Sequence, residues 1–389
     1  MNMRYDFDSP VDRRASGSYK WDDNPGDPDD MIQLWVADMD FRAAPAVMDA
    51  LRRRMEHGVF GYTYVPDRYY QSLTDWFERR HGYRISREKV IYTSGVVPAV
   101  SAVIKALTMP GDGVIVNTPA YNCFFSSIRN NGCRIVESPL CRVDTVGAFT
   151  YRIDFDALEK LAADPSNRLF ILCNPHNPSG RVWSHDELER VADICRRNGV
   201  RVISDEIHCE LTVPGIGYIP YGTVDSAAVI CNSPSKAFNT AGLQIANIIA
   251  PDLRTRAMID KAINVNEVCD VNPFGVVGLV AAYNAGESWL DALRGYLAEN
   301  YATLYAFFAD RLPCYPVARL EATYLAWIDI TASGLDGDAV CSLLADKAHV
   351  RIASGSIYGD RDYVRINFAV PRHVLTDALG RIAEVLNRL

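Results

Sequence analysis

The chain of 389 residues lacks several features that would place it in a familiar class of protein. Its ten cysteines include no C-x-x-C pair, and some lie inside apolar runs such as 169–173, as small buried hydrophobes do in a reducing cytosol. We therefore expect neither a disulfide framework nor a metal site. The 40 Lys and Arg residues are outnumbered by 48 Asp and Glu residues, and no extended basic tract offsets the net charge of −8. A nucleic-acid partner is not expected, because little positive charge is available for a phosphate backbone.

Long apolar segments are also missing. No uncharged apolar run reaches the ~18 to 20 residues that a membrane helix needs. The first ten residues carry Asp6 and Asp8 and contain no apolar segment of the kind found in a secretory signal. We therefore expect a cytoplasmic protein without a membrane partner.

Short apolar runs alternate with segments of helical spacing between about residues 45 and 285. Helices are predicted over 46–57, 69–80, 99–107 and 123–130. A capping box formed by Ser184 and Glu187 predicts a further helix that ends near residue 198. Strands are predicted over 89–92, 114–116, 134–136, 169–173, 200–204 and 227–231. Continuous apolar strands separated by helices indicate a mostly parallel sheet with both faces covered.

The two ends of the chain follow other patterns. Asp, Pro and Gly dominate the first 30 residues, which predicts an irregular arm. After about residue 285, long helical patterns surround alternating segments, which is typical of an α+β domain; the helices are predicted over 289–311, 337–348 and 374–389, and the alternating segments cover 324–330 and 363–368. A chain of this length exceeds one ordinary core. We predict an arm and part of a small domain over 1–45, a large domain over 46–285, and a small C-terminal domain over 286–389.

Polar residues directly follow several of the apolar runs, and in open parallel sheets ligands bind at the carboxyl ends of the strands. Ser94, Gly95 and Val96 follow one strand and begin a helix, whose free N–H groups suit an anion, although an ordinary glycine turn explains them equally well. The sequence has no G-x-G-x-x-G or G-x-x-x-x-G-K motif after a strand. A dinucleotide or a nucleoside triphosphate is therefore disfavoured.

Three ionisable residues follow later strands. Asp205 could pair with a protonated ring nitrogen, or it could cap a helix, and His208 is more simply explained as a structural histidine. Lys236 follows the strand predicted over 227–231. Desolvation there could lower its pKa as Schiff-base chemistry requires, whereas most lysines are solvated surface residues.

Two further residues are candidates because of their surroundings. Tyr121 follows the strand predicted over 114–116 and could lie over a flat ring, although packing in the core explains it more simply. Arg365 lies in a run of alternating apolar residues, where a guanidinium is costly unless a carboxylate meets it.

These residues, in this order, resemble the fold-type I enzymes of pyridoxal 5′-phosphate (PLP) over nearly the whole chain. The chain is more narrowly similar to the MalY/PatB type of cystathionine β-lyase, or cysteine-S-conjugate β-lyase. The motifs that carry the closer match are LWVADMDF (34–41), GYT (61–63), SGVVP (94–98), NPHNPSG (174–180), DEIH (205–208) and SPSKAFN (233–239). The resemblance implies the α/β fold of the aspartate aminotransferase-like, PLP-dependent transferases. That fold has a large domain with a mostly parallel, seven-stranded sheet and a smaller α+β domain.

The resemblance also implies a role for each matching residue. Lys236 would bond to PLP and later move the substrate's α-proton, Asp205 would pair with the ring nitrogen, and Tyr121 would stack on the ring. The remaining cofactor-binding residues would be Gly95, Val96, Val97, Asn177, His208, Ser233 and Ser235. Arg365, Ala37 and Asn177 would bind an amino acid substrate. Tyr62 would reach the cofactor of a neighbouring subunit, so that a homodimer with shared active sites would be the functional unit.

The activity that the resemblance implies is β-elimination from cystathionine or a related cysteine conjugate to a thiol, pyruvate and ammonia. An aminotransferase of class I/II is the first alternative, because elimination and transamination share their first steps. Many aminotransferases of this fold carry a phosphate-binding Arg eight residues after the lysine, whereas position 244 here is Gln, which fits the lyase branch. The second alternative is a PLP-binding regulatory protein with low turnover. A damaged catalytic set would indicate it, and the set here is intact.

Overall fold

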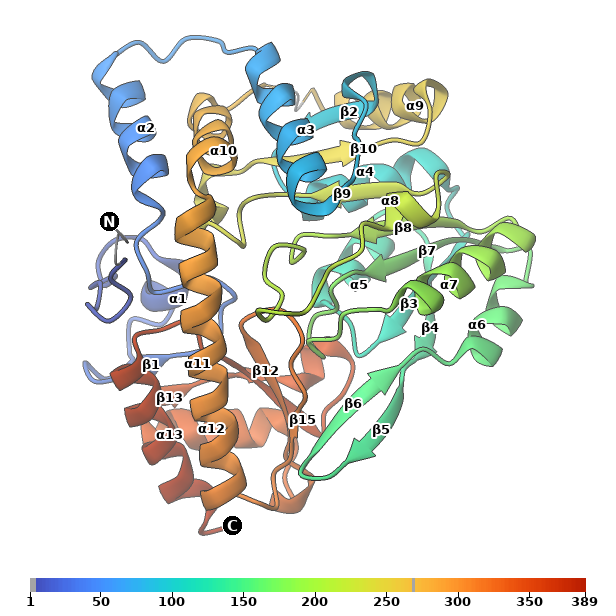
Figure 1. Ribbon diagram of the computed structural model, residues 1–389. Coiled ribbons are helices and arrows are strands. Elements are labelled where there is room, and N and C mark those ends of the chain that lie inside the picture. The colour runs from blue at the N-terminus through green and yellow to red at the C-terminus, as the bar shows by residue number, and fades with distance from the viewer. Residues whose placement is uncertain (1–4, 268–269) are drawn as a thin grey trace.

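A mostly parallel sheet of seven strands forms the centre of the computed structural model, which describes residues 5–267 and 270–389 (Figure 1). Its strand order is β2-β10-β9-β8-β7-β3-β4. The strands are β2 (Val90–Thr93), β3 (Gly113–Thr118), β4 (Arg134–Pro139), β7 (Asn167–Cys173), β8 (Arg201–Asp205), β9 (Val229–Asn232) and β10 (Ala246–Ile249). Only β10 runs antiparallel to its neighbours. The predicted α/β class and mostly parallel sheet are confirmed, whereas Cys269 and residues 1–4 lie outside the described residues.

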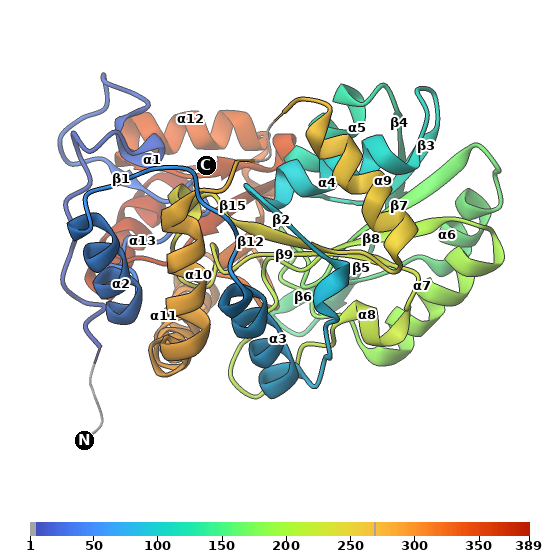
Figure 2. The same ribbon diagram turned by 90° about the horizontal axis from the view of Figure 1, so that it is seen from above.

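Helices cover both faces of this sheet (Figure 2). One face packs against α4 (Val96–Leu107), α5 (Asn122–Asn130) and α9 (Leu253–Asn264), and the other packs against α6 (Phe155–Ala162), α7 (His185–Arg197) and α8 (Tyr221–Val224). Successive strand residues therefore enter different cores: Ile171 packs with the first group of helices, and Phe170 and Leu172 pack with the second. Burial on both faces explains why these strands are apolar without alternation.

A second sheet has the order β14-β15-β12-β11-β6-β5. Its strands are β5 (Cys141–Thr145), β6 (Ala148–Arg152), β11 (Val317–Ala318), β12 (Leu325–Asp329), β14 (Ala353–Ser354) and β15 (Tyr363–Asn367). Three long helices accompany it: α11 (Glu287–Arg311), α12 (Gly337–Ala348) and α13 (Arg372–Leu386). The hairpin of β5 and β6 thus pairs with strands from the C-terminal part of the chain. The predicted domain boundaries stay a prediction.

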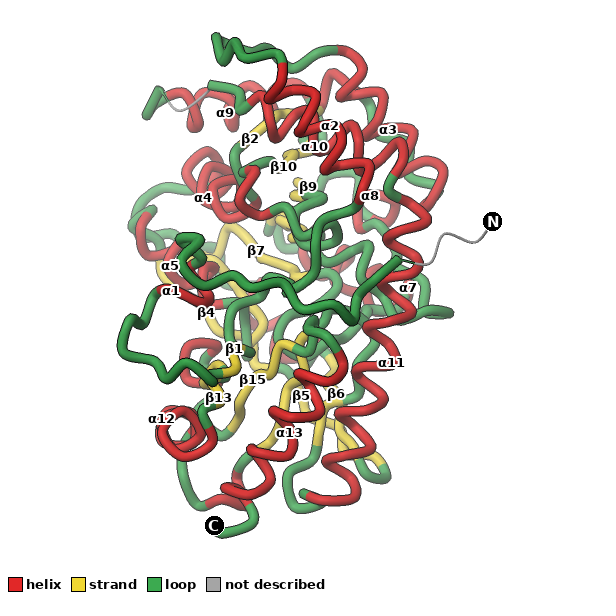
Figure 3. Tube along the Cα trace, turned by 90° about the vertical axis from the view of Figure 1, so that its left-hand side faces the viewer, coloured by secondary structure: helices red, strands yellow, loops and turns green. Residues whose placement is uncertain are grey.

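The N-terminal arm is mainly loop, as the sequence predicts, and it runs across one side of the molecule (Figure 3). It contains α1 (Tyr19–Asp22) and β1 (Ile32–Gln33), which pairs with β13 (Val350–Arg351). The helices α2 (Pro45–Glu56), α3 (Asp67–His81) and α10 (Pro273–Ala285) follow, and α10 contacts both of the others. Four short 3-10 helices are η1 (Arg87–Lys89), η2 (Ala241–Leu243), η3 (Thr331–Ser333) and η4 (Gly355–Tyr358).

Two local predictions can be compared with the structure directly. The Ser184 hydroxyl accepts a hydrogen bond from the Glu187 N–H, and the Glu187 carboxylate accepts one from the Ser184 N–H, so the capping box is confirmed. The nine cysteines within the described residues are unpaired. In the described ranges, no helix combines the length and the apolar character needed to cross a membrane.

Candidate active site

A cavity of about 200 Å³ lies where several strands of the seven-stranded sheet end. Ten of the predicted site residues line it: Ala37, Gly95, Val96, Val97, Tyr121, Asn177, Asp205, His208, Ser235 and Lys236. They come from six separate segments of the chain, from the N-terminal arm to the turn after β9. The fold therefore brings together residues up to 199 positions apart in the sequence.

Lys236 follows β9 in a turn that its neighbours fix. The Ser233 hydroxyl donates a hydrogen bond to the Ile245 carbonyl and accepts one from the Ser235 N–H, while Ala237 and Phe238 are buried in the core. The Lys236 ammonium donates a hydrogen bond to the Ala37 carbonyl. Burial and the nearby Arg365 lower the pKa of Lys236 to about 8, so roughly a tenth of the amine is neutral at pH 7.

Asp205 closes β8 and is 3% exposed. Its carboxylate accepts one hydrogen bond from the Ile207 N–H at 3.1 Å, and burial raises the pKa of Asp205 to about 7. No ion pair of Asp205 occurs among the described residues. The adjacent Glu206 has the same raised pKa of about 7 from burial, but Ser204, Tyr218 and the Tyr221 N–H satisfy its carboxylate. The Glu206 carboxylate is therefore satisfied by its hydrogen bonds, whereas the Asp205 carboxylate still lacks a partner.

His208 and Arg365 also carry unused polar atoms. His208 is 2% exposed, its Nδ1 has no partner in the described part of the chain, and burial holds its pKa well below the usual range. Arg365 lies on β15 and donates to the Asn177 side-chain oxygen at 3.2 Å and to the Trp35 carbonyl at 3.1 Å. Its guanidinium lies 4.6 Å from the centre of the Tyr358 ring, and its Nε is unpartnered within the described ranges. The carboxylate that a buried guanidinium needs is therefore left for a ligand.

Two further parts of the cavity wall are formed by the backbone at Gly95 and by the Tyr121 ring. Gly95 precedes α4, whose first turn has no side-chain cap among the described residues, so its backbone N–H groups are available to an anion. Tyr121 is half-buried at the start of α5 and packs edge-on against Phe124. Burial raises the pKa of the Tyr121 phenol, which therefore stays protonated.

Three predicted residues are not part of the cavity wall. Ser233 lies in the turn before Lys236, where its hydroxyl is already hydrogen-bonded, and Arg365 reaches the site through Asn177. Tyr62 is 99% exposed in the loop between α2 and α3 and lines a different surface hollow of about 720 Å³ together with Arg54 and Arg68. Within one chain, Tyr62 is thus separate from the Lys236 cavity.

Sequence reasoning missed Tyr324 and Asn367. The Tyr324 hydroxyl donates a 2.9 Å hydrogen bond to the Ala37 carbonyl, the same atom that Lys236 contacts, and the Asn367 amide donates to the carbonyls of Val36 and Asp38. Tyr324 directly precedes β12 and Asn367 ends β15, both in the second sheet, where buried residues are the rule. No signal in the sequence distinguishes them from core residues.

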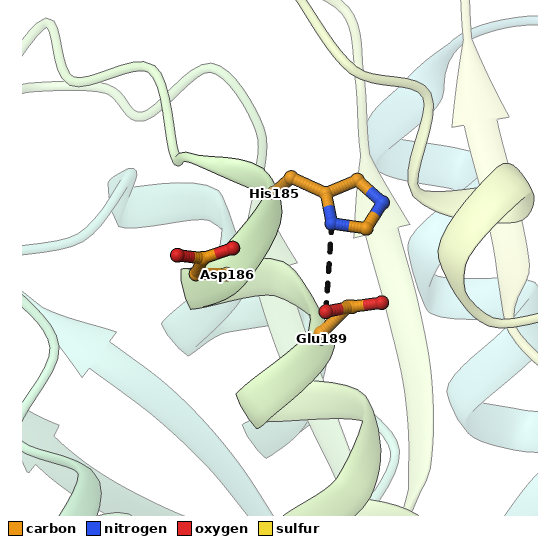
Figure 4. A group of neighbouring side chains, drawn as sticks. All are labelled: His185, Asp186 and Glu189. Atoms are coloured by element: carbon orange, nitrogen blue, oxygen red, sulfur yellow. Dashed lines mark ion pairs between the residues drawn. The ribbon is translucent and has the colours of Figure 1, made fainter.

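One cluster of possible metal ligands is found among the described residues: His185, Asp186 and Glu189, all exposed at the start of α7 (Figure 4). His185 and Glu189 approach each other to 3.5 Å, and Figure 4 draws an ion pair between these two residues, with Asp186 beside them. None of the three lines the Lys236 cavity. Exposed polar groups of this kind are frequent at helix starts, because acidic side chains there are favoured by the helix dipole.

Comparison with known proteins gives a consistent result. The family model "Aminotransferase class I and II" matches residues 29–382. Cystathionine beta-lyase PatB of Bacillus subtilis (strain 168) is 38% identical over 390 residues, which cover 98% of this chain and 100% of that protein. The PLP-containing structure of cystalysin from Treponema denticola has a TM-score of 0.95 at 34% identity and covers 99% of this chain and 100% of its own. The PLP-bound C-S lyase from Staphylococcus hominis has a TM-score of 0.90 at 33% identity, with 98% and 99% covered.

Proposed function

The chain belongs to the class I and II aminotransferase family, and from this premise we propose that it is a PLP-dependent carbon–sulfur β-lyase. Its substrate would be cystathionine or a related L-cysteine S-conjugate, and its products a thiol, pyruvate and ammonia. The observation that carries the proposal is one cavity that holds both Lys236 and the Asp205 carboxylate, which has no ion pair among the described residues, and that Arg365 reaches through its hydrogen bond to Asn177. The names of the relatives with similar sequence and fold, a cystathionine β-lyase and a C-S lyase, support the lyase assignment.

The residues present fit PLP. The buried Asp205 carboxylate needs a cation, which a protonated ring nitrogen offers, and the uncapped first turn of α4 suits a phosphate. Gly95, Val96, Val97 and Ser235 would hold the phosphate, and Ser233 would fix the turn that carries Ser235. Tyr121, Asn177, Asp205 and His208 would hold the ring. When bound, PLP supplies an aldehyde that bonds to amines and a ring that withdraws electrons from the substrate's α-carbon.

Each side chain then has a defined task. Arg365 and Asn177, with the backbone at Ala37, bind the substrate's α-carboxylate and so fix the direction of the Cα–H bond. Lys236 removes the α-proton, since its lowered pKa of about 8 leaves neutral amine available. Asp205 keeps a proton on the ring nitrogen, because each charge favours the other. The β-carbon–sulfur bond breaks, the thiolate leaves and takes a proton, and hydrolysis of the remaining fragment gives pyruvate and ammonia.

An aminotransferase is the second candidate, because it shares proton removal by Lys236. The position at which many aminotransferases of this fold carry a phosphate-binding Arg is Gln244, an exposed residue at the end of η2 with φ of 51°. Gln244 brings no positive charge to the phosphate. The lyase is therefore the better supported of the two.

We expect the purified, PLP-loaded protein to form pyruvate and homocysteine from L-cystathionine. A parallel reaction with an amino donor and 2-oxoglutarate is expected to form glutamate at least ~100-fold more slowly. The reason is that Gln244 adds no positive charge to bind the cofactor's phosphate while a keto acid is released. Pyruvate and glutamate are measured by coupled assays on the same preparation. Glutamate without pyruvate would assign the protein to the transaminases, and the absence of both products would favour the regulatory alternative.

We also propose a cytoplasmic homodimer with shared active sites. The loop between α2 and α3 exposes three aromatic side chains, Phe60, Tyr62 and Tyr64, next to the apolar face of α10, and a second copy of the chain would bury this surface. Tyr62 would then reach the partner's cofactor. The free cysteines of the described residues support a reducing compartment.

Mixing two inactive variants tests the shared site. Tyr62→Phe would lack the hydroxyl that Tyr62 contributes to the partner's site, and Lys236→Ala would lack the amine. Each homodimer should therefore be nearly inactive. After subunit exchange at equal amounts, about a quarter of all sites combine an intact Lys236 with an intact Tyr62, and activity is expected to recover to about that fraction. Tyr64→Phe, a neighbouring exposed tyrosine, serves as the control and should be active alone. Verified heterodimers without recovered activity would refute the shared site.

A further inference from the structure

Residues 35–41, here called the strap, pass directly beside Lys236, whose amine contacts the Ala37 carbonyl. On the inner side, side chains from the second sheet and from the Lys236 turn hold the strap's carbonyl groups. Arg365 donates to Trp35, Asn367 donates to Val36 and Asp38 at 2.6 Å each, and Asn239 donates to Met39 at 2.8 Å. The Ala37 carbonyl, at the centre of the strap, accepts from Lys236 and Tyr324. The position of this one carbonyl therefore sets the direction of the Lys236 amine.

On the outer side, the N-terminal arm grips the strap through charged groups. Arg13 donates to both Asp38 oxygens, at 2.9 and 2.6 Å, and to Asp40 at 2.6 Å. Lys20 donates to Asp40 at 3.0 Å and lies 3.7 Å from Asp38, and its side chain is 0% exposed. The Trp21 ring N–H also donates to Asp40 at 3.2 Å. Two cations and two carboxylates thus form a closed cluster against the strap.

This cluster has no part in the chemistry described so far, because none of its four charged residues lines the Lys236 cavity. Burial of a lysine against carboxylates is also weak evidence for a stabilising role, since desolvation offsets much of the attraction between the charges. A bidentate arginine does, however, fix geometry, because both of its N–H groups must align with both oxygens. Asp38 adjoins Ala37 in the chain, so fixing Asp38 fixes the carbonyl that contacts Lys236.

We propose that Arg13 and Lys20 are positioning residues of the active site: through Asp38 and Asp40 they hold the strap so that the Ala37 carbonyl keeps the Lys236 amine directed at the substrate's α-carbon. The inference rests on the proposed lyase function and assigns a task to the arm of the chain. Arg13 also neutralises Asp38, the carboxylate of the strap whose charge acts on Lys236.

Removal of Arg13 should therefore shift the pKa of the Lys236 nitrogen in a predictable direction. Lys236 is faced by charged and titratable groups from every element around it: Arg365, Asp38, Asp205, Cys123, His208, Tyr121 and Tyr324. Loss of the Arg13 cation leaves the Asp38 charge less compensated, which favours the protonated form of the nitrogen at Lys236. The pKa of that nitrogen should rise.

The first measurement uses the cofactor-free protein and does not depend on activity. Amide hydrogen exchange of the strap is expected to be about tenfold faster in Arg13→Met and in Lys20→Met than in the wild type, since the outer contacts of the strap are lost. Arg14→Met is the matched control: Arg14 is the next residue, is exposed, and pairs with Asp12 instead of the strap. Its strap should exchange at the wild-type rate.

The second measurement uses the PLP-loaded protein. The pKa of the cofactor's absorbance change is expected to rise by about half a unit or more in Arg13→Met and to stay unchanged in Arg14→Met. kcat should fall about tenfold in Arg13→Met with a smaller change in KM, because the amine is misdirected while the carboxylate site remains. Adding Asp38→Asn to Arg13→Met should return the spectral pKa toward the wild-type value, since the uncompensated charge is removed.

Arg13→Lys keeps the charge without the bidentate contact, and it serves if Arg13→Met does not fold. It should leave the spectral pKa near the wild-type value while the strap still exchanges faster. A wild type that forms pyruvate, together with Arg13 variants that match Arg14→Met in exchange, spectrum and kcat, would overturn the positioning role. A wild type that forms no pyruvate would instead overturn the proposed function, whatever the strap variants do.

Discussion

Replacement of Lys236 by alanine is expected to lower kcat/KM for cystathionine by at least about 10⁴-fold, which is about 5 kcal/mol or more of transition-state stabilisation. Lys236 is the one lysine of the cavity, and its amine is already directed by the Ala37 carbonyl. Alanine removes both the group that bonds to the cofactor's aldehyde and the base that takes the α-proton. The measurement is steady-state formation of pyruvate by the loaded variant.

The covalent bond itself can be located independently of turnover. Borohydride reduction of the wild type should fix a pyridoxyl group on Lys236, which peptide mass mapping identifies, and the variant should carry none. Lys261→Ala, at an exposed lysine of α9, is the matched control and should keep both the pyridoxyl group on Lys236 and the activity. A pyridoxyl group on another lysine, or an active Lys236→Ala protein, would contradict the assignment.

Six of the seven strands of the central sheet are predicted from the sequence, because most of them are buried on both faces; β10 is not among the predicted strands. A run such as 169–173 must then be apolar at every position, and this pattern cannot be mistaken for a solvated helix. The polar residue that ends such a run, Asp205 after β8, consequently lies at the carboxyl edge of the sheet. Most of the cavity could be predicted for the same reason, since ten predicted residues line it.

The second sheet and the apolar helix α10 were less predictable. β5 and β6 are amphipathic hairpin strands in the middle of the chain, and only tertiary pairing with β11 places them in a sheet with C-terminal strands. α10 has apolar residues all around its axis and two glycines, so no helical period is present in its sequence. The inner contacts of the strap are equally hidden, because they join residues about 200 to 330 positions apart.

Neutralising Asp205 is expected to cost about 10³-fold in kcat/KM, since a preorganised charge in a water-poor site is lost. Asp205→Asn keeps the size of the side chain but can no longer hold a proton on the ring nitrogen. Glu206→Gln is the matched control, because Glu206 is the next residue, is equally buried and has the same raised pKa of about 7, yet its carboxylate bonds to Ser204, Tyr218 and Tyr221 outside the cavity. It should lose less than about tenfold.

Asp205 should also leave a signature in the stability of the cofactor-free protein. Its pKa of about 7 in the folded state lies above the 3.8 of an ordinary Asp, so its contribution to stability is fully present below pH 4 and is lost as the pH rises through 7. Asp205→Asn carries no charge at any pH. Relative to the wild type, the variant should therefore gain on the order of 2 to 3 kcal/mol in free energy of unfolding between pH 5 and pH 8.

Binding of PLP should abolish this pH-dependent loss of stability at Asp205, but not the one at Glu206. A protonated ring nitrogen beside the carboxylate lowers its pKa, so the loaded wild type should no longer lose the Asp205 contribution between pH 5 and pH 8. Glu206→Gln should show a similar gain to Asp205→Asn without cofactor, and that gain should persist when PLP is bound, because Glu206 lies outside the cavity and keeps its partners Ser204, Tyr218 and Tyr221. Denaturant unfolding of the three proteins at both pH values, with and without PLP, measures these differences. If the cofactor left the pH dependence of the wild type unchanged while turnover in Asp205→Asn stayed near normal, the ring nitrogen would not be the partner of Asp205.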